Sequence, residues 1–499
     1  MLRRDGEPKQ VTFADQARAV QAVPEDHHLL RMRRAADWAA VEAQLERYYD
    51  RSQGRPGYPP AVLLRMLFLE QFADLSDREV HEQVGYNLLY RAFVGRGADE
   101  LVPDDTTLVR FRERIGAAGL RQVFETLNAQ WAAAGLLGRE RRVLDGVHLW
   151  AKVARRAWVS LLRQGRQVVV EAVAQGDPAR GEALRATFVP PPEEPEPRGE
   201  EALRVESERT VQLLDAVADV ADPQVQARVA QVRTLVAGET DRVVSFVDPD
   251  ARWGHKAPDK PFCGSKAHET LDPDSRLLAA VDVVPGNANE AVRTDTLLAR
   301  EAPALPEGVV VIADGLYHNA TTVGPVEDAG GRPCFSGLTA PRVSDAFTYE
   351  AATDQMICAE GQRSIGKARV DHGDLYYFSM HDCAACPRRA ECLTPGEREG
   401  KAHPRRRVYL SDVRKRQVVA GEAGKAWRKA HLRLRSRIEP KFAEQMVHHG
   451  LRRARYWGLA KVTGQVLVNA ITVNLKRAVK LLAQAAARSA PPAPAEVAV

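Results

Sequence analysis

The stretch Gly308-Val309-Val310-Val311-Ile312-Ala313-Asp314 is a continuous apolar run that stops at a carboxylate. Such a run predicts a strand buried on both faces, as in a parallel sheet covered by helices. A second strand-like segment, residues 141–150, contains Val143-Leu144-Asp145. Ligands collect at strand ends in open α/β sheets. The two segments therefore predict an α/β fold that presents Asp145 and Asp314 to a ligand.

The remaining patterns predict a mixed sheet flanked by helices. Turn signals such as Asp248-Pro249-Asp250 separate an antiparallel meander of strands at 242–247, 260–270 and 276–284. A helix at about 289–302 precedes the buried run, and a short strand follows near 333–337. From about 413 to 486 the chain is predicted to be helical.

These patterns divide the chain into four parts. Residues 1–57 form an N-terminal helical or irregular segment, and residues 58–137 form an all-helical domain in which Ser76 and Glu79 have the spacing of a capping box. Residues 138–486 form the α/β domain, with insertions at about 155–240 and 340–412. The first insertion carries a Pro-rich linker at 190–197, and the second is expected to be irregular. The Ala/Pro-rich tail 487–499 is expected to be disordered.

Composition excludes several classes of protein, and the distribution of charge points to a partner. Among the 499 residues, 44% are apolar and 27% are charged, which excludes collagen-like, fully disordered and disulfide-scaffold chains. The net charge is only +5, but residues 401–480 hold 21 Lys and Arg against four Asp and Glu. That segment is +17 and the rest −12. The asymmetry favours a phosphate-rich partner, although a solvated helical face is the simpler alternative.

Other features bear on location. No stretch approaches about 20 uninterrupted apolar residues, so no membrane span is expected. The start of the chain has no apolar run of the kind found in signal peptides. Six cysteines without a secretion signal favour a reducing cytoplasm.

Three acids are candidate metal ligands. Mg²⁺ binds a few carboxylates and keeps waters for substrate phosphates, and two such ions can promote phosphoryl transfer. Asp145 and Asp314 fit this role, although either could simply cap a turn. Glu439 is a rare acid in the basic segment, and its alternative role is a local ion pair. Asp282, inside a predicted strand, ranks below the two aspartates.

The order of these segments resembles bacterial insertion-sequence transposases of the DDE type. Residues 143–146 resemble the first acidic strand of that family, and 311–317 resemble the second, in which Gly and Tyr follow the Asp. Residues 262–268 are similar to the intervening hairpin, and 451–459 and 474–477 to the C-terminal helices. The resemblance implies a ribonuclease-H-like catalytic core: a mixed sheet flanked by helices, here with an N-terminal all-helical domain and two insertions.

The third acid resembles part of a signature, Y-(2)-R-(3)-E-(6)-K, found within that superfamily. Arg435 and Glu439 have the required spacing, but Leu432 and Met446 stand at the Tyr and Lys positions. Pro440 directly follows Glu439 and disfavours helical geometry before it, so Glu439 is expected at a kink or a helix start. Glu444 is the fallback ligand.

The resemblance implies a DNA transposase that performs metal-dependent phosphodiester hydrolysis and strand transfer at the ends of a mobile element. Asp145, Asp314 and Glu439 would bind two Mg²⁺ ions, with Mn²⁺ as an alternative. The partners would be DNA, as terminal inverted repeats recognised by residues 58–137 and as target DNA, and a second copy of the chain in at least a homodimer. Alternatives are a metal-dependent nuclease of the same fold and an inactive DNA-binding protein. The helical domain could also be purely structural.

Four cysteines form a separate candidate site. Cys383 and Cys386 form a CxxC, Cys392 follows, and Cys358 lies upstream. Four thiolates can hold one tetrahedral Zn²⁺, which would order an apolar-poor segment. The alternative is a set of reduced structural cysteines. His381 and His403 are candidate substitute ligands for the Zn²⁺.

Basic and aromatic side chains are candidate DNA contacts. Phosphate contacts give affinity and register, and aromatic rings can stack on exposed bases. The candidates are Lys266, Arg405, Arg406, Arg407, Arg435, Arg452, Arg453, Arg455 and Trp457.

Overall fold

A computed structural model gives the three-dimensional structure. It describes residues 23–49, 57–97, 99–153, 158–189, 199–237, 244–257, 259–289, 293–301, 305–317, 320–336, 346–370, 372–393 and 405–489. The expected linker 190–197, the end of the expected tail and His403 lie outside these residues.

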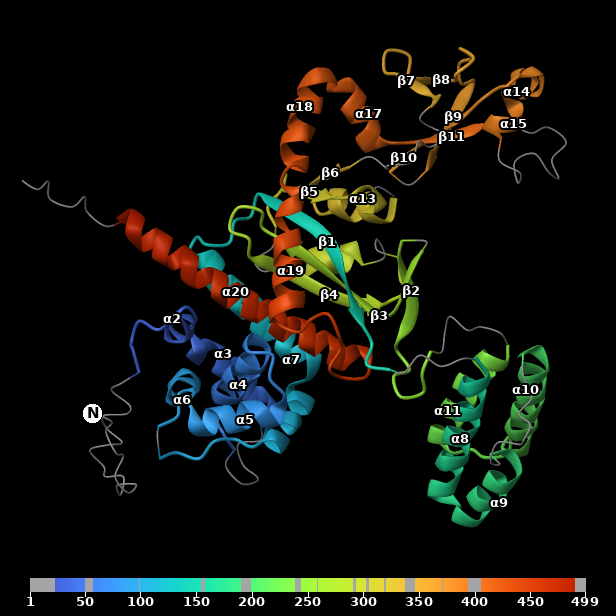
Figure 1. Ribbon diagram of the computed structural model, residues 1–499. Coiled ribbons are helices and arrows are strands. Elements are labelled where there is room, and N and C mark those ends of the chain that lie inside the picture. Colours follow the sequence, from blue (N-terminus) through green and yellow to red (C-terminus); the bar gives the residue numbers. More distant parts are fainter. Residues whose placement is uncertain are drawn as a thin grey trace, which may run out of the picture.

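A six-stranded mixed sheet forms the centre of the molecule (Figure 1). Its strands are β1 (Arg141–Trp150), β2 (Arg252–Ala257), β3 (Lys260–Leu271), β4 (Leu278–Pro285), β5 (Val310–Ala313) and β6 (Arg332–Phe335). β1 lies between β3, which is antiparallel to it, and β5, which is parallel. β6 continues the sheet parallel to β5, and both β2 and β4 pair with β3. The predicted mixed α/β class is confirmed.

One predicted strand is wrong. The described part of 242–247 forms bends, and the next strand begins at Arg252. The Ser245 hydroxyl accepts hydrogen bonds from the amides of Val247 and Asp248. A side-chain oxygen that binds nearby amides offers the backbone an alternative to a strand ladder, so the Val-rich pattern there is overridden.

The two faces of the sheet belong to different apolar clusters. Val143, Val147 and Ile312 pack in the large cluster that also contains the N-terminal helices. Leu144 and Val311 pack on the other face, with Tyr317 and the helices α12 (Thr294–Ala299) and α13 (Ala320–Asp328). Successive strand side chains point to opposite faces, which explains this division.

The N-terminal region is helical, as predicted. Its helices are α2 (His28–Arg34), α3 (Trp38–Leu45), α4 (Pro60–Phe72), α5 (Asp77–Tyr86), α6 (Leu88–Val94) and α7 (Asp105–Ala133). The capping box of Ser76 and Glu79 opens α5. α7 is bent at a non-helical residue, Gly116. This region shares its core with the sheet and with the long helix α20 (Leu459–Ser489).

The first insertion forms a helical unit with a core of its own (Figure 1). Its helices are α8 (Trp158–Gly176), α9 (Pro178–Phe188), α10 (Gly199–Ala216) and α11 (Pro223–Val236).

The second insertion was expected to be irregular, and that expectation is wrong. It contains β7 (Thr348–Glu350), β8 (Gln355–Ile357), β9 (Gly366–Val370), β10 (Gly373–Tyr377), β11 (Arg407–Ser411), α14 (Met380–Ala385) and α15 (Arg389–Cys392). A small core of Met356, Tyr376, Phe378 and Val408 holds it. The Asp354 carboxylate also accepts hydrogen bonds from Tyr349 and Tyr376, which substitutes for a larger core.

The basic segment is helical, as predicted. It comprises α17 (Asp412–Val419), α18 (Gly421–Leu432), α19 (Glu439–His448) and α20. α19 begins at Glu439, which confirms the helix start expected before Pro440. In the part of the chain that the structure describes, no helix is both long and apolar enough to cross a membrane.

Candidate active site

Asp145 and Asp314 stand at the same level of two neighbouring parallel strands. Arg141, Arg142 and Val143 of β1 pair with Val310, Val311 and Ile312 of β5. Continued by two residues, this register sets Asp145 opposite Asp314, which directly follows β5. Neighbouring strands lie about 4.8 Å apart, so the two backbones are close.

The two carboxylates also belong to the same face of the sheet. Asp145 alternates with Val143 and Val147, and Asp314 with Ile312, all three of which lie in the large cluster. Both side chains are partly exposed. The strands therefore direct two accessible carboxylates toward the side of the sheet that α19 and α20 cover.

Local hydrogen bonds fix how each aspartate sits. Asp145 Oδ1 accepts a hydrogen bond from the Gly146 amide at 2.8 Å. Asp314 Oδ1 accepts one from the Leu316 amide, also at 2.8 Å. These short-range bonds restrain the orientation of the two carboxylates.

A buried histidine–tyrosine pair lies on the opposite face, behind the aspartates. His268 Nδ1 is 3.1 Å from the Tyr317 hydroxyl. His268 pairs with Gly146 across the β1–β3 ladder, and Tyr317 belongs to the turn that follows Asp314. Burial, helped by the charge of Lys266, lowers the pKa of His268 to about 4, so the ring is neutral at pH 7. The pair ties the Asp314 turn to the strand beside Asp145.

Glu439 is not gathered with the two aspartates. Arg437, two residues earlier, donates a hydrogen bond to the Pro273 carbonyl, in the turn that also contacts Arg141 at the start of β1. Asp145 lies four residues further along, about 13 Å at strand spacing. The Glu439 side chain is 60% exposed and lies 3.9 Å from Arg435. In the described ranges, no three His, Cys, Asp or Glu side chains form a group that could hold a metal ion.

The side chain of α19 that reaches the level of Asp145 is Gln445. It donates a hydrogen bond to Glu269, the residue that pairs with Asp145 on β3. Glu269 is fully buried, and this burial raises its pKa to about 7. Sequence reasoning missed this carboxyl group, although an acid inside the apolar β3 pattern was a signal for it.

Glu444 and Asp282, the lower-ranked candidate metal ligands, both form ion pairs. Although burial alone raises the pKa of Glu444, Lys441 and Lys476 lower it to about 2. Asp282 is buried and contacts Arg293 and Arg300. It pairs with His268 in the β3–β4 ladder, so it belongs to the face opposite Asp145.

Two family models match parts of the chain. Residues 17–114 match the family model described as Transposase domain (DUF772). Residues 357–479 match the one described as Transposase DDE domain. The chain is a transposase of the DDE type. The second match contains Glu439, whereas Asp145 and Asp314 lie outside both matched ranges. No solved structure matches the chain.

The four cysteines of the transposase lie within the DDE match but do not form a zinc site in the structure. Cys383 and Cys386 belong to α14 and its C-terminal cap, Cys392 ends α15, and Cys358 follows β8. All four are free thiols, and burial raises the pKa of Cys392, with the other three thiols adding to the effect. The four thiols therefore lie near one another. Among the described residues, however, no group of His, Cys, Asp or Glu side chains could hold a metal ion, so the predicted zinc site is not supported.

The predicted DNA contacts of the transposase differ in accessibility. Lys266 is buried, and its ammonium donates to the Ala288 carbonyl, so its position does not support a role in phosphate binding. Arg455 is paired with Glu70 and Asp74. Arg405 stacks over the Tyr377 ring. Four of the candidates are exposed: Arg407, Arg452, Arg453 and Trp457. Three are half-buried: Arg405, Arg406 and Arg435.

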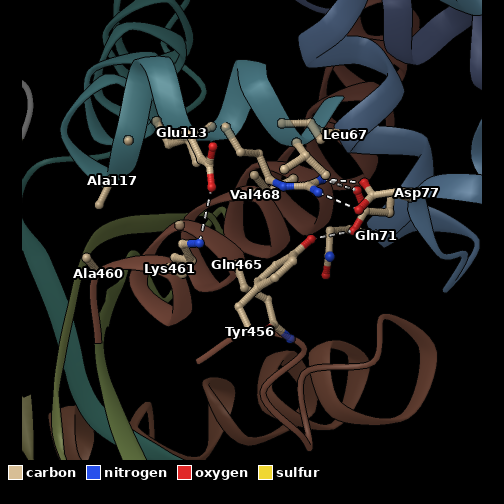
Figure 2. Close-up of a pocket in the computed structure, with 16 residues that line it drawn as sticks. Leu67, Gln71, Asp77, Glu113, Ala117, Tyr456, Ala460, Lys461, Gln465 and Val468 are labelled. Carbon is tan, nitrogen blue, oxygen red and sulfur yellow. Dashed lines mark hydrogen bonds and ion pairs between the residues drawn. The ribbon is translucent and has the colours of Figure 1, made fainter. Parts of the chain in front are cut away.

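A separate pocket of about 370 Å³ lies between α4, α5, α7 and α20 (Figure 2). Its charged groups are paired with one another: Arg112 with Asp77, and Lys461 with Glu113. The Tyr456 hydroxyl donates to buried Glu70. Because these charges are already neutralised, the pocket offers little to a DNA phosphate.

Proposed function

We propose that the transposase cuts and joins DNA at a site built on Asp145 and Asp314. The observation that carries this proposal is their register: two carboxylates at one level of adjacent parallel strands, on one face of the sheet. In the strand order β2-β3-β1-β5-β6, β1, β5 and β6 are parallel, and β3 is antiparallel to β1, β2 and β4. This mixed arrangement supports a ribonuclease-H-like core.

The two aspartates are the groups that would hold divalent metal. Mg²⁺ takes one or two protein carboxylates and completes its shell with water and substrate phosphate oxygens, and Mn²⁺ accepts the same ligands. A metal bound there would lower the pKa of a bound water and neutralise charge on the phosphate and on the leaving oxygen. The carboxylates supply the charge and orientation, since their amide hydrogen bonds restrain them.

The chemistry consists of two phosphoryl transfers. In hydrolysis, a water oxygen forms a bond to the phosphorus, the bond from phosphorus to the 3′ oxygen breaks, and the water proton passes to solvent. The product is a free 3′-hydroxyl. In strand transfer, that hydroxyl attacks a target phosphate, and the bond to the target's 3′ oxygen breaks. No oxidant or external energy source is required.

Glu439 is proposed as the third ligand because the resemblance and the matched DDE range both contain it. Its exposed side chain at the start of α19 has room to turn, and Arg435 is its only ion-pair partner within the described residues. A role for Glu439 requires the start of α19 to approach Asp145 when DNA binds, so it is tested separately from the aspartates.

The transposase is proposed to act on the terminal repeats of DNA together with a second copy of the chain. Residues 17–114, which match a transposase domain, are proposed to recognise the terminal repeats. Bringing two ends together implies at least a dimer. Six free cysteines support a location in the reducing cytoplasm.

The test is a cleavage assay on a supercoiled plasmid that carries both ends of the element. The wild-type chain with Mg²⁺ should give nicked, linear and joined products. Asp145→Asn and Asp314→Asn should each lose at least about 1,000-fold in rate, since removing one group of a charge-stabilising site costs about that much. Glu439→Gln is assayed in parallel.

The control is Asp295→Asn, an aspartate in the first turn of α12, on the other face of the sheet. It should cut at the wild-type rate. Wild-type cleavage by Asp145→Asn would eliminate the assigned site. Cleavage without joined products would favour the nuclease alternative.

A further inference from the structure

A basic groove lies on the hairpin of α17 and α18. Its volume is about 840 Å³, and nine residues line it, none of them acidic: Arg414, Val418, Gly421, Gly424, Lys425, Arg428, Lys429, Leu432 and Arg433. Five of these side chains are cations. Figure 1 shows this hairpin above the central sheet and beside the strands β7 to β11.

Lys429 and Arg433 contribute most to the positive charge that the groove presents. Lys429 and Arg433 are exposed and have no ion pair among the described side chains. Arg428 donates to the Phe335 carbonyl, which carries no net charge. Lys425 contacts Glu422, but both side chains are more than 70% exposed, so this pair is weak.

The opposite side of α17 is different, because its cations are paired. Lys415 contacts Asp374, and Arg416 contacts Glu327. Arg369 of β9 also binds Asp412, the first residue of the helix. These ion pairs fix α17 against the second insertion and against α13. The helix therefore has one side that anchors it and one side that presents charge.

The groove adjoins the candidate active site through a short chain of contacts. The Arg428 guanidinium is 2.7 Å from the Phe335 carbonyl at the end of β6. Ser336, the next residue, donates its amide to the Ala313 carbonyl, directly before Asp314. A DNA strand lying in the groove would thus pass close to Asp314, because this chain of contacts ends at Ala313, the residue before it.

We propose that this groove binds the phosphate backbone of the DNA whose scissile phosphate reaches Asp314. Cations without acidic partners are what a polyphosphate requires, and the exposed Val418 offers an apolar edge to sugars. Gly421, at a positive φ of 54° with open space at its Cβ position, leaves room for a backbone. The proposal rests on the function proposed above and adds the path of the DNA to it.

The test is DNA binding by the full-length chain as a function of salt, measured by fluorescence anisotropy. The probes are a 30-base-pair duplex of arbitrary sequence and duplexes of the same length copied from the DNA on either side of the coding sequence. In the double variant Lys429→Ala/Arg433→Ala, the slope of log K against log salt should fall by about 1.8, which is about 0.9 for each lost phosphate contact. The dissociation constant near 0.15 M salt should rise about tenfold.

The matched control is Arg204→Ala/Arg233→Ala, which removes two exposed cations from the first insertion. It should bind as the wild type does. The charge-conserving variant Lys429→Arg/Arg433→Lys should restore binding, which separates lost charge from altered folding. A loss on both kinds of duplex identifies a general phosphate contact, and a loss on the flanking duplexes alone identifies a contact made in the end complex; both support the groove.

Wild-type affinity and salt slope in the double variant would overturn the proposal. This outcome differs from failure of the proposed function. Asp145→Asn should keep its DNA binding while losing cleavage, so a cleavage result against the aspartates leaves the groove measurement intact, and the reverse is also true.

Discussion

Among single residues, the buried Glu269 makes the stability of the core depend on pH. Its carboxyl group is fully buried beside Asp145's strand and has a pKa of about 7, against 4.5 in its ordinary state. Because the folded pKa is higher, the folded state binds the proton more tightly. This contribution to stability is complete below about pH 4.5 and is lost as the pH rises through about 7.

Glu269→Gln should therefore gain stability over the wild type as the pH rises. The variant cannot ionise, so the difference in the free energy of unfolding should grow by about 1.4 kcal/mol for each pH unit between about 4.5 and 7. Urea unfolding at several pH values measures it. A constant difference across this range would show that the pKa of Glu269 is the same in the folded and unfolded states. Glu208→Gln, on the exposed surface of α10, is the control.

The His268–Tyr317 pair is expected to position Asp314. Tyr317→Phe removes one buried hydrogen bond, at a cost of about 1 kcal/mol, and frees the turn that carries the aspartate. We expect DNA cleavage about fivefold slower or more with DNA affinity unchanged. Tyr349→Phe removes a tyrosine hydrogen bond in the second insertion and should leave cleavage alone. Equal effects of the two variants on cleavage would assign the loss to general destabilisation.

The sequence was sufficient to predict the strand that contains Asp145 and the strand that precedes Asp314, because apolar runs mark buried strands. It did not show which way the side chains of these strands face. The burial of Lys266 depends on its pairing with His148, a contact between residues far apart in the chain. The Glu269–Gln445 hydrogen bond, 176 residues apart, was beyond sequence reasoning for the same reason.

At the scale of elements, the bend in α7 depends on one glycine. Gly116 has φ 56° and ψ −170°, a conformation that residues with a Cβ adopt at high cost. The helix continues on both sides of this residue, from Asp105 to Ala133. The bend lets the second half of α7 reach the sheet, where Asn128 donates to the carbonyls of Leu278 and Ala279.

Gly116→Ala should destabilise the transposase by about 1–3 kcal/mol, because alanine strains the bend. Gly85→Ala, within α5, should have the opposite sign: a gain of up to about 1 kcal/mol, since its Cβ would meet open space. Thermal unfolding of both variants decides between these signs. A neutral Gly116→Ala would mean that α7 can straighten.

Element boundaries were predictable where a local signal was strong. Pro440 marks the start of α19, and Ser76 with Glu79 marks the start of α5. The strand predicted at 242–247 does not form, because the Ser245 hydroxyl binds two backbone amides there. The strands of the second insertion were not predicted because ion pairs of Asp354 and Asp374 and tyrosine hydrogen bonds, which leave no periodic pattern, supplement a small apolar core.

At the scale of the whole molecule, the cores do not follow the predicted division of the chain. The N-terminal helices share one apolar cluster with the sheet and α20, so the first family match and the end of the second are packed together. The first insertion has a separate cluster that includes Phe246. The sequence predicted an insertion at about 155–240 but not that it has a core of its own.

The first insertion should therefore fold without the rest of the chain. A polypeptide of residues 152–250 should show helical circular dichroism and a cooperative thermal transition, because its buried side chains contact mainly one another. Leu213→Ala, in the centre of that cluster, should lower the midpoint, at a cost of about 2–5 kcal/mol. A broad, non-cooperative transition would show that the insertion depends on the core.

Asp145 and Asp314 are proposed to hold divalent metal together. Replacing Mg²⁺ with Fe²⁺ in the presence of ascorbate and peroxide generates hydroxyl radicals at the bound ion, and these cut the nearby backbone. We predict cuts next to both residue 145 and residue 314, mapped by mass spectrometry of the fragments. Both cuts should disappear in Asp145→Asn and in Asp314→Asn alike. Persistence of either cut in the single variants, or cuts at other sites only, would show that the two aspartates do not hold the metal together.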